Sequence, residues 1–331
     1  MYDTTDVLVI GGGAAGLSAA LVLGRSRRSV LVVDAGEPRN GAAAGVHNYL
    51  GREGTDPRGL ARIGRDEVAQ YGVRFASGRI VDASAGPVTA DDPVGFTATL
   101  DSGGTVAARR VVVASGARDV LPDVPGLAAQ WGRGVVHCPF CHGWEVRDRR
   151  IGVLVTTPFG AHQALMWRAV SAHVTVFVTD PALVGERDLA GFRAHGIDVV
   201  RGPVREVLSD GDVLTGVVLA DGSTVPLDAL AAASTAEARV TGLAGLGLVA
   251  ADQTVGDVRI GSALPVGPTG ATDVPGVWAA GNVAAPMATV IVSAAAGTTA
   301  GAAVHGDLVQ ADLVAALARA DARTPAGQST R

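Results

Sequence analysis

Residues 6–16 read DVLVIGGGAAG, an apolar run that passes directly into glycines. The run predicts a short buried strand ending at Ile10, and the residues from Ala14 to Leu23 predict a helix. Val30 to Asp34 is a second apolar run and predicts the next strand. A strand, a glycine turn, a helix and a further strand make a βαβ unit, so this stretch indicates a nucleotide-binding α/β domain.

The glycines of the turn fit the GxGxxG pattern from Gly11 to Gly16, and Asp34 closes the following strand. Glycine lets the backbone approach a pyrophosphate at the helix N-terminus, while the carboxylate accepts hydrogen bonds from a ribose. The alternative is a glycine-rich turn that binds no ligand. This alternative does not explain why an acidic residue, Asp34, stands at the end of the next strand. The pattern predicts a dinucleotide site without distinguishing NAD from FAD.

Composition limits the classes of protein to which the chain can belong. The 331 residues correspond to about two domains, and the sequence contains no apolar run long enough for a membrane span. The net charge of −5 comes without a basic stripe, which argues against a nucleic-acid partner. The acidic residues before the first strand do not resemble an export signal, so we expect a cytoplasmic location.

A second unit of the same kind follows the first. The end of the first unit, LDSGGTV leading to VVVASGA, is echoed by LADGSTV leading to LAAASTA. We therefore expect two Rossmann-like, three-layer α/β domains, the second inserted into the first. After the insertion, a small-residue helix is expected near Ala288 to Val304. The predicted boundaries are 1–116 and 245–318 for the first domain, 117–244 for the second, and 319–331 for a flexible tail.

The only cysteines are Cys138 and Cys141, in the stretch HCPFCHGWE. A CxxC pair at the start of a helix has a lowered thiolate pKa and forms a disulfide readily, as thiol exchange requires. Zinc binding is the alternative, but a structural zinc site usually takes a second CxxC or an HxxxH pair, which the sequence lacks. The motif predicts redox chemistry and no metal site.

A segment near the C-terminus resembles the thioredoxin reductase family. Residues 276–282, GVWAAGN, match that family's second flavin fingerprint, G-[VIF]-[FWY]-A-[AC]-G-D, whose last residue faces the ribityl and phosphate groups. Asn282 replaces the acid, which removes a charge but keeps a hydrogen-bonding group. Residues 48–51, NYLG, stand at the family's N-W-P-G, so the resemblance implies that Asn48 hydrogen-bonds the isoalloxazine.

The cofactor implied by this resemblance is FAD. Ser115-Gly116 stands at the position of the family's A-T-G. The residues expected to bind FAD are Gly11, Gly13, Ala14, Ala15, Gly16, Asp34, Ala35, Arg39, Asn40, Asn48, Ala114, Ser115, Gly116, Gly281, Asn282, Thr289 and Val290.

The cysteine motif has the placement of C-A-T-C-D-G in low-molecular-weight thioredoxin reductases. By this resemblance Cys141 lies against the flavin C4a carbon, and Cys138 exchanges with the substrate. His142 stands where the family has an acid, and would move the thiol proton as catalytic base. A helix-end polar residue without chemistry is the alternative for His142. The choice between a catalytic and a structural role stays open for His137, as does the role of His47.

The second nucleotide motif of a thioredoxin reductase is degraded. Thr156 and Pro158 replace both critical glycines of the second GxGxxA, which adds side-chain bulk and removes an amide donor. The next strand ends in Asp180 instead of an arginine cluster for the 2′-phosphate of NADPH. We therefore expect that NADPH does not bind and that electrons enter from thiols.

These features together resemble the dithiol oxidases of bacterial and fungal natural-product pathways, which close disulfides in holomycin, gliotoxin and romidepsin-type compounds. The resemblance implies a homodimer that oxidises a small-molecule dithiol to an intramolecular disulfide, with O2 as acceptor and H2O2 as product. Phe140 and Trp144 are candidate substrate contacts, with core packing as the alternative. The rival functions are an NAD(P)H-dependent reductase of protein disulfides and a non-catalytic flavin and thiol redox sensor.

Overall fold

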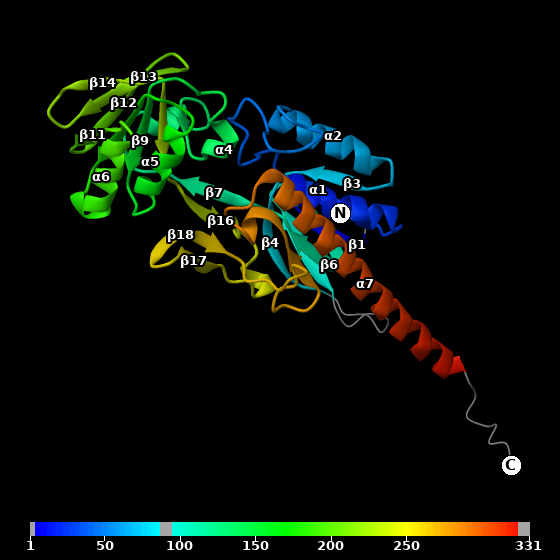
Figure 1. Cartoon of the computed structure of the whole chain (residues 1–331). Helices are drawn as coiled ribbons and strands as arrows, with labels where there is room; N and C mark the ends of the chain where they lie inside the picture. The colour runs from blue at the N-terminus through cyan, green and yellow to red at the C-terminus, as the bar shows by residue number, and fades with distance from the viewer. Residues whose placement is uncertain (1–3, 87–94, 324–331) are drawn as a thin grey trace.

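The protein has two lobes and a long C-terminal helix that extends past the first lobe (Figure 1). The computed structural model describes residues 4–86 and 95–323. Strands from both ends of the chain share the sheet of the first lobe, and the second lobe is formed by the residues between them. This is the inserted arrangement that the sequence predicts.

A seven-stranded sheet lies at the centre of the first lobe, in the order β3-β2-β1-β6-β5-β4, with β19 beside β6. Val7 and Val9 of β1 pack into one hydrophobic core, and Leu8 packs into another on the opposite face. Both faces of β1 are therefore buried, as expected for a parallel strand between two layers. The strands are β1 (Thr5–Ile10), β2 (Val30–Asp34), β3 (Arg74–Ser77), β4 (Ile80–Ala85), β5 (Phe96–Leu100), β6 (Thr105–Val113) and β19 (Val277–Ala279).

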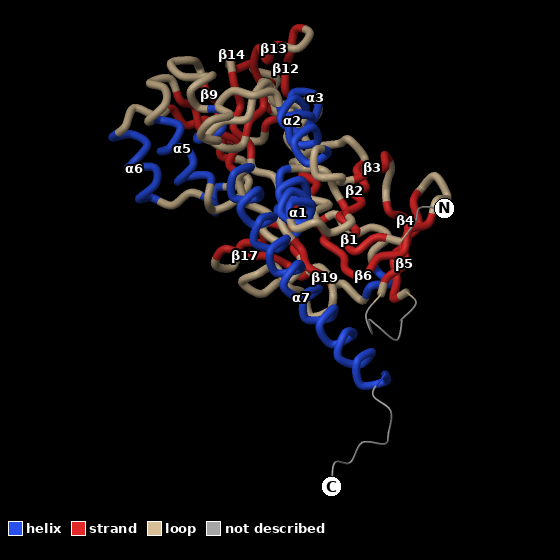
Figure 2. Tube along the Cα trace, turned by 90° about the vertical axis from the view of Figure 1, so that its right-hand side faces the viewer, coloured by secondary structure: helices blue, strands red, loops and turns tan. Residues whose placement is uncertain are grey.

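Helices α1 (Ala14–Arg25) and α7 (Val290–Arg323) lie side by side over this sheet, with α2 (Pro57–Ala69) beyond α1 (Figure 2). The backbones of α1 and α7 are in direct contact. A Cβ atom on Gly297 would lie 2.0 Å from the carbonyl oxygen of Ala15. The same one-turn spacing places Gly301 against Ala19, where a Cβ would lie 2.8 Å from the carbonyl oxygen. Only glycine on α7 permits this approach.

Helix α7 is longer than the sequence predicts. Arg109 of β6 donates a hydrogen bond of 2.7 Å to Asp312, which ties the later turns of α7 to the sheet. Residues 319–323, the start of the predicted tail, are helical. Residues 324–331 lie outside the described residues. The polar composition from residue 319 onward suggested a flexible tail. The first of these residues instead continue α7, because the earlier turns of the helix are already held against the sheet.

The second lobe contains a five-stranded parallel sheet, in the order β11-β10-β9-β15-β8, and a separate antiparallel sheet of β12, β13 and β14. Trp167, Phe177 and Phe192 are fully buried in its core. Its elements are α3 (Leu127–Gln130), β8 (Val135–Val136), α4 (Pro139–His142), β9 (Ile151–Val155), α5 (Gly160–Arg168), β10 (Val174–Val178), η1 (Pro181–Leu183), α6 (Glu186–Ala194), β11 (Asp198–Arg201), β12 (Val204–Asp210), β13 (Val213–Leu219), β14 (Thr224–Pro226) and β15 (Ala229–Ala232).

A third, four-stranded sheet connects the lobes, in the order β17-β18-β16-β7. The chain enters the second lobe through β7 (Ala117–Val120) and leaves it through β16 (Thr235–Ala238), and these two strands pair antiparallel. The sheet thus combines segments from both sides of the predicted domain boundaries at 116/117 and 244/245. These boundaries stay predictions. The remaining elements are η2 (Ala244–Leu246), β17 (Ala251–Val255), β18 (Val258–Ala263) and η3 (Gly281–Val283).

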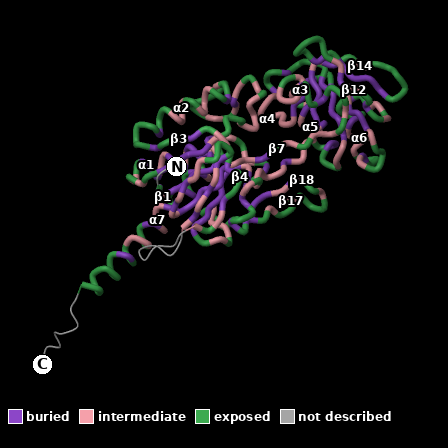
Figure 3. Tube along the Cα trace, turned by 180° about the vertical axis from the view of Figure 1, so that it is seen from behind, coloured by how far each residue is buried: buried purple, intermediate pink, exposed green. Residues whose placement is uncertain are grey.

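Buried residues gather in the strands of both lobes, and exposed residues dominate the far end of α7 (Figure 3). Among the helices of residues 4–86 and 95–323, none combines the length and the apolar character needed to cross a lipid bilayer.

The contact between α1 and α7 predicts a steep cost for Gly297→Ala. The added Cβ must push α7 away from Ala15, and overpacking of this kind costs about 1–3 kcal/mol. We expect a melting temperature lower by several degrees and weaker retention of the flavin that the sequence predicts, measured by thermal denaturation and by the flavin absorbance that survives gel filtration.

Gly306→Ala on the same helix is the matched control. No described atom lies within 4 Å of its Cβ position, so the substitution gains helix propensity without a clash and should stabilise by up to about 1 kcal/mol. Equal stability of the two variants would refute the packing argument.

Candidate active site

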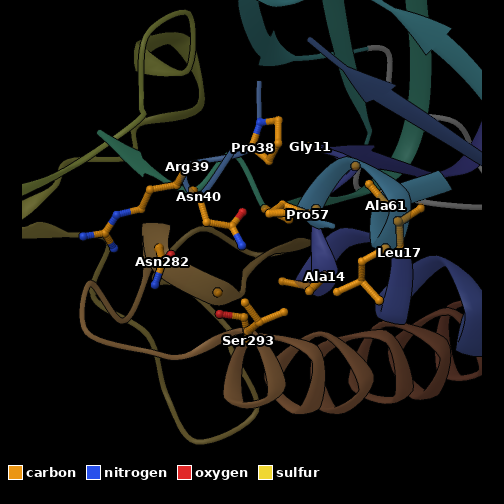
Figure 4. Close-up of a pocket in the computed structure, with 18 of the residues that line it drawn as sticks. Gly11, Ala14, Leu17, Pro38, Arg39, Asn40, Pro57, Ala61, Asn282 and Ser293 are labelled. Carbon is orange, nitrogen blue, oxygen red and sulfur yellow. The ribbon is translucent and has the colours of Figure 1, made fainter. Parts of the chain in front are cut away.

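One large cavity joins the glycine turn to the cysteine pair. Its volume is about 1740 Å³, above the roughly 300–1,000 Å³ of most small-molecule sites. Gly11 and Ala14 line one end, shown with Asn282 in Figure 4, and Cys138 and Cys141 also line it. The cavity is large enough for a dinucleotide together with a substrate.

The glycine turn between β1 and α1 leaves space for a ligand. Gly11 has a φ of +109°, and a Cβ there would lie 2.3 Å from the carbonyl oxygen of Ala114. A Cβ on Gly16 would lie 1.9 Å from the carbonyl oxygen of Gly11, so α1 starts in contact with β1. Around Gly13, in contrast, no described atom lies within 4 Å of the Cβ position. Among the described residues no side chain caps α1, so its first amides can bind a pyrophosphate.

Asp34 stands at the end of β2 beside this turn. Its Oδ1 accepts a hydrogen bond of 2.9 Å from the Gly12 N–H, and its Oδ2 lies 3.7 Å from Nη1 of Arg65. The carboxylate is therefore fixed at the edge of the cavity, where the sequence predicts a ribose contact.

Most of the residues predicted to bind the cofactor lie in the wall of this cavity. They are Gly11, Gly13, Ala14, Ala15, Asp34, Ala35, Arg39, Asn40, Ala114, Ser115, Gly116, Gly281, Asn282, Thr289 and Val290. Gly16 and Asn48 are not among the lining residues. The individual contacts of all these residues with the cofactor stay predictions.

Arg39 and Asn282 make hydrogen bonds to the protein itself. Arg39 donates to both carboxylate oxygens of Asp119, at 3.0 and 2.7 Å, and to the carbonyl of Pro286 at 2.7 Å. Nδ2 of Asn282 lies 2.9–3.3 Å from three carbonyl oxygens within residues 285–288. An aspartate has no N–H to donate, so the amide at this position holds the 285–288 loop beside the cavity.

The two cysteine sulfurs lie 2.7 Å apart, with Cys138 at the N-terminus of the short helix α4. The hydrogen bond from Cys141, helped by the backbone N–H groups of Cys141 and Phe140 and opposed by burial, lowers the pKa of Cys138 to about 6. The pKa of Cys141 is raised, because its thiol donates that hydrogen bond and is partly buried beside the Cys138 thiolate. The pair therefore holds one proton and one negative charge near neutral pH.

His142 and His137 both line the cavity beside the sulfurs, but their surroundings differ. Nδ1 of His137 lies 3.2 Å from the carbonyl oxygen of Ala232, so this nitrogen carries its proton and donates. Within the described residues, both ring nitrogens of His142 are buried without a hydrogen-bond partner. Burial lowers the pKa of His142, which keeps the ring neutral and able to accept a proton at pH 7.

Asn48 holds the cysteine turn instead of lining the cavity. It adopts a φ of +59°, and its Nδ2 donates a hydrogen bond of 2.6 Å to the carbonyl of Phe140, between the two cysteines. Its contact with the flavin stays a prediction. The sequence predicts neither this link nor the role of Asp119, because a side-chain bond to a backbone carbonyl or to a distant arginine leaves no local pattern.

Phe140 and Trp144 are exposed, with 74% and 73% of their surface accessible. Packing in the core of this chain therefore does not explain either side chain. The guanidinium of Arg147 lies 4.0 Å from the ring centre of Trp144 and covers one face of it.

The turn that opens α5 in the second lobe is built differently from the glycine turn. Phe159 is the N-cap, Pro158 has no N–H, and the Gly160 N–H bonds the carbonyl of Thr157 at 3.0 Å. Asp180, at the end of β10, accepts the backbone N–H two residues further on and so caps η1. Amide donors for a second pyrophosphate are thus reduced.

The described residues contain no group of three or more His, Cys, Asp or Glu side chains placed to hold a metal ion. The cysteine pair therefore has thiol and imidazole neighbours but no arrangement of ligands typical of zinc.

Comparisons with known proteins agree with this geometry. Residues 5–301 match the family model described as pyridine nucleotide-disulphide oxidoreductase. Thioredoxin reductase tcpT of Claviceps purpurea is 34% identical, over 90% of this chain and 92% of its own. Thioredoxin reductase sirT of Leptosphaeria maculans is 32% identical, over 94% and 96%. The crystal structure of HlmI superposes with a TM-score of 0.86 and 40% identity, covering 97% of each chain.

The hydrogen bond between the sulfurs predicts how the reduced protein reacts with an alkylating agent. Alkylation of Cys138 should rise with pH and reach half its maximum near pH 6. Cys141→Ala removes the donor, so the pKa of Cys138 should return toward about 8.5. At pH 6.5 we expect labelling roughly five- to tenfold slower, because higher intrinsic nucleophilicity offsets part of the lost thiolate.

The rate is measured anaerobically with iodoacetamide and peptide mass spectrometry. Cys138→Ala serves as the control that identifies the labelled sulfur. An unchanged midpoint in Cys141→Ala would show that the second thiol does not set the ionisation of the first.

Proposed function

The chain belongs to the pyridine nucleotide-disulphide oxidoreductase family, and on that premise we propose that it is a dithiol oxidase. It is a thioredoxin reductase-like oxidoreductase with FAD as its cofactor. The proposed substrate is a small-molecule dithiol, which becomes an intramolecular disulfide. The proposed acceptor is O2, so that one dithiol and one O2 give one cyclic disulfide and one H2O2.

One observation carries this proposal: the cysteine pair and the glycine turn open into the same cavity. The corresponding turn of the second lobe has Phe159 at its N-cap and a proline without an N–H at position 158. The sulfurs can therefore exchange electrons with a cofactor held at the first turn. Thr156 and Pro158 disfavour a nicotinamide donor at the second turn. Electrons then have to enter the protein through thiols.

The residues that would hold FAD are the amides of the glycine turn, Asp34 for a ribose, and the start of α7 around Thr289 and Val290. When bound, FAD supplies two-electron transfer from the reduced cysteine pair to the acceptor.

The cysteine pair performs the exchange with substrate. A substrate thiolate attacks Sγ of Cys138 in the oxidised pair, the bond between the cysteines breaks, and Cys141 leaves as a thiolate. The second substrate thiolate then attacks the substrate sulfur bound to Cys138, closes the ring, and expels the Cys138 thiolate. Two electrons pass from the substrate to the pair. The lowered pKa of Cys138 makes it the better leaving group for ring closure.

His142 is the proposed base for the substrate thiols. Its ring is neutral because burial lowers its pKa, and neither nitrogen has a partner among the described residues. A neutral imidazole can take a thiol proton and return it later. His137 is the weaker candidate, because its Nδ1 already donates to a carbonyl.

Phe140 and Trp144 are the proposed contacts for the apolar part of the substrate, since both are exposed near Cys138 in sequence. A homodimer is also proposed, on the family resemblance, and the cytoplasmic location stays a prediction.

A reductase of disulfides is the second candidate, because two relatives carry the name thioredoxin reductase. Anaerobic titration separates the two. We expect a stoichiometric dithiol such as dithiothreitol to bleach the yellow absorbance of the flavin, and NADPH to leave that absorbance unchanged for minutes. Rapid bleaching by NADPH would favour the reductase.

In air, the wild type should turn over dithiol with steady O2 consumption and H2O2 release, recorded with an oxygen electrode. Cys138→Ala should lower this rate by at least roughly a hundredfold while FAD stays bound. A single stoichiometric reduction without turnover would instead indicate a redox sensor.

A further inference from the structure

The guanidinium of Arg39 joins three segments of the chain. Its Nε and Nη2 donate to the two carboxylate oxygens of Asp119 at 3.0 and 2.7 Å, and its Nη1 donates to the carbonyl of Pro286 at 2.7 Å. Arg39 follows β2, Asp119 belongs to β7, and Pro286 precedes α7. A planar guanidinium that makes two bonds to one carboxylate has a fixed orientation. The three segments are therefore held in one arrangement by a single side chain.

Asp119 is attached to both strands that connect the lobes. It lies in β7, where it is paired with Ala236 of β16. Its Oδ1 accepts a hydrogen bond of 2.8 Å from the hydroxyl of Ser234, which directly precedes β16. The carboxylate thus joins the entry and the exit of the lobe that carries the cysteines.

The loop that carries Arg39 also packs against the second lobe. Gly132 lies between α3 and β8 of that lobe, with a φ of +77°. A Cβ there would lie 3.0 Å from the Cβ of Ala42, which is three residues after Arg39. The loop is therefore in contact with the second lobe as well as with the strand that leads into it.

The segment before α7 forms the other end of these contacts. The carbonyl of Pro286 accepts from Arg39 and also, at 3.3 Å, from Nδ2 of Asn282. Arg39 and Asn282 lie at the same end of the cavity (Figure 4), and Thr289 lines it three residues after Pro286. A movement of Arg39 would therefore shift a part of the wall where the sequence predicts cofactor contacts.

Partial burial makes the pair of Asp119 and Arg39 costly to break. Their side chains are only 11% and 24% exposed. Burial raises the pKa of Asp119, but the hydrogen bonds from Arg39 and Ser234 outweigh it and lower this pKa, so the carboxylate stays ionised. Removal of either charge leaves the other partly buried without its partner, which is strongly unfavourable.

We infer that Asp119 is a positioning residue that couples the retention of FAD, through Arg39, to the position of the lobe carrying the cysteines. Asp119 need not touch the flavin, because Arg39 and the segment at Pro286 transmit its effect. Coupling of this kind is reciprocal, so bound FAD also fixes the second lobe. It does not depend on the chemistry of the substrate and would hold equally in a disulfide reductase.

Asp119→Asn tests the coupling, because it keeps the shape of the side chain but loses the charge and one acceptor. The full, FAD-loaded protein is diluted, and release of FAD is followed by the rise of flavin fluorescence. We expect release roughly ten- to hundredfold faster than in the wild type, within the roughly 5- to 150-fold range of typical coupling. Release at the wild-type rate would contradict the coupling.

A double-mutant cycle shows whether Asp119 acts through Arg39. Arg39→Met keeps a long side chain without the guanidinium. In this background Asp119→Asn should speed FAD release by less than about twofold, or slow it, because the carboxylate no longer has a partner to orient. Independent, additive effects of the two substitutions would show that Asp119 does not act through Arg39.

Hydrogen–deuterium exchange of the FAD-loaded proteins reports on both ends of the contacts. In Asp119→Asn, the amides of β7 and β16 and those of residues 285–292 should all exchange faster than in the wild type. A merely local structural role would speed exchange in β7 and β16 alone, and that result would also count against the coupling.

Ser234→Ala weakens the hold on the same carboxylate without removing its charge, and it decides the question if Asp119→Asn does not fold. Loss of this hydrogen bond should speed FAD release roughly two- to tenfold. An unchanged rate would speak against a role for the connecting strands in retaining FAD.

Asp252→Asn is the matched control. Asp252 lies in β17 of the same four-stranded sheet and pairs with Arg259 at 2.8 Å, but neither residue is among those that line the cavity. Its FAD release and its exchange at residues 285–292 should equal those of the wild type. Faster release in this variant would mean that any loosening of the sheet frees FAD, and the specific role of Asp119 would be refuted.

Discussion

Direct backbone contact between α1 and its neighbours is the constraint on which the site depends. Gly16 sets the helix against β1, and Gly297 and Gly301 set α7 against the other side of the helix. With side chains at these positions the helix would move away, and its N-terminus would no longer face the space around Gly13. The space around Gly13 that can hold a pyrophosphate therefore depends on the packing of β1, α1 and α7, and not on the glycine turn alone.

The chemistry of the cysteine pair depends on a different kind of contact, namely polar bonds between segments far apart in sequence. Asn48 reaches the carbonyl of Phe140, and Arg39 reaches Asp119 on the strand that enters the second lobe. The pair between Arg39 and Asp119 is partly buried, which makes it matter more than it would in water. These bonds fix the two sulfurs relative to the cavity, while the short helix α4 contributes only one turn.

The sequence was sufficient for the parts of the protein that rest on local patterns. The strand ending at Ile10, the helix starting at Ala14 and the insertion of one α/β unit in another follow from periodicity and repeated motifs, and all are present. The four-stranded connecting sheet was not predicted, because short strands such as β7 become strands only by pairing with segments that are distant in sequence. Likewise, Asn282 resembles a flavin contact in sequence, yet its amide nitrogen is engaged by a nearby loop. Which way a polar side chain turns is decided by the acceptors around it.

Helix α7 has a consequence for how the protein matures. Its first residue, Val290, and the preceding Thr289 line the cavity, and the helix packs on α1 through residues near 297. During synthesis the N-terminal glycine turn emerges early, but the helix that closes it leaves the ribosome only after the whole second lobe. The cofactor must therefore bind largely after synthesis is complete. A polypeptide interrupted before α7 would leave the apolar surface that α7 covers exposed to chaperones and proteases.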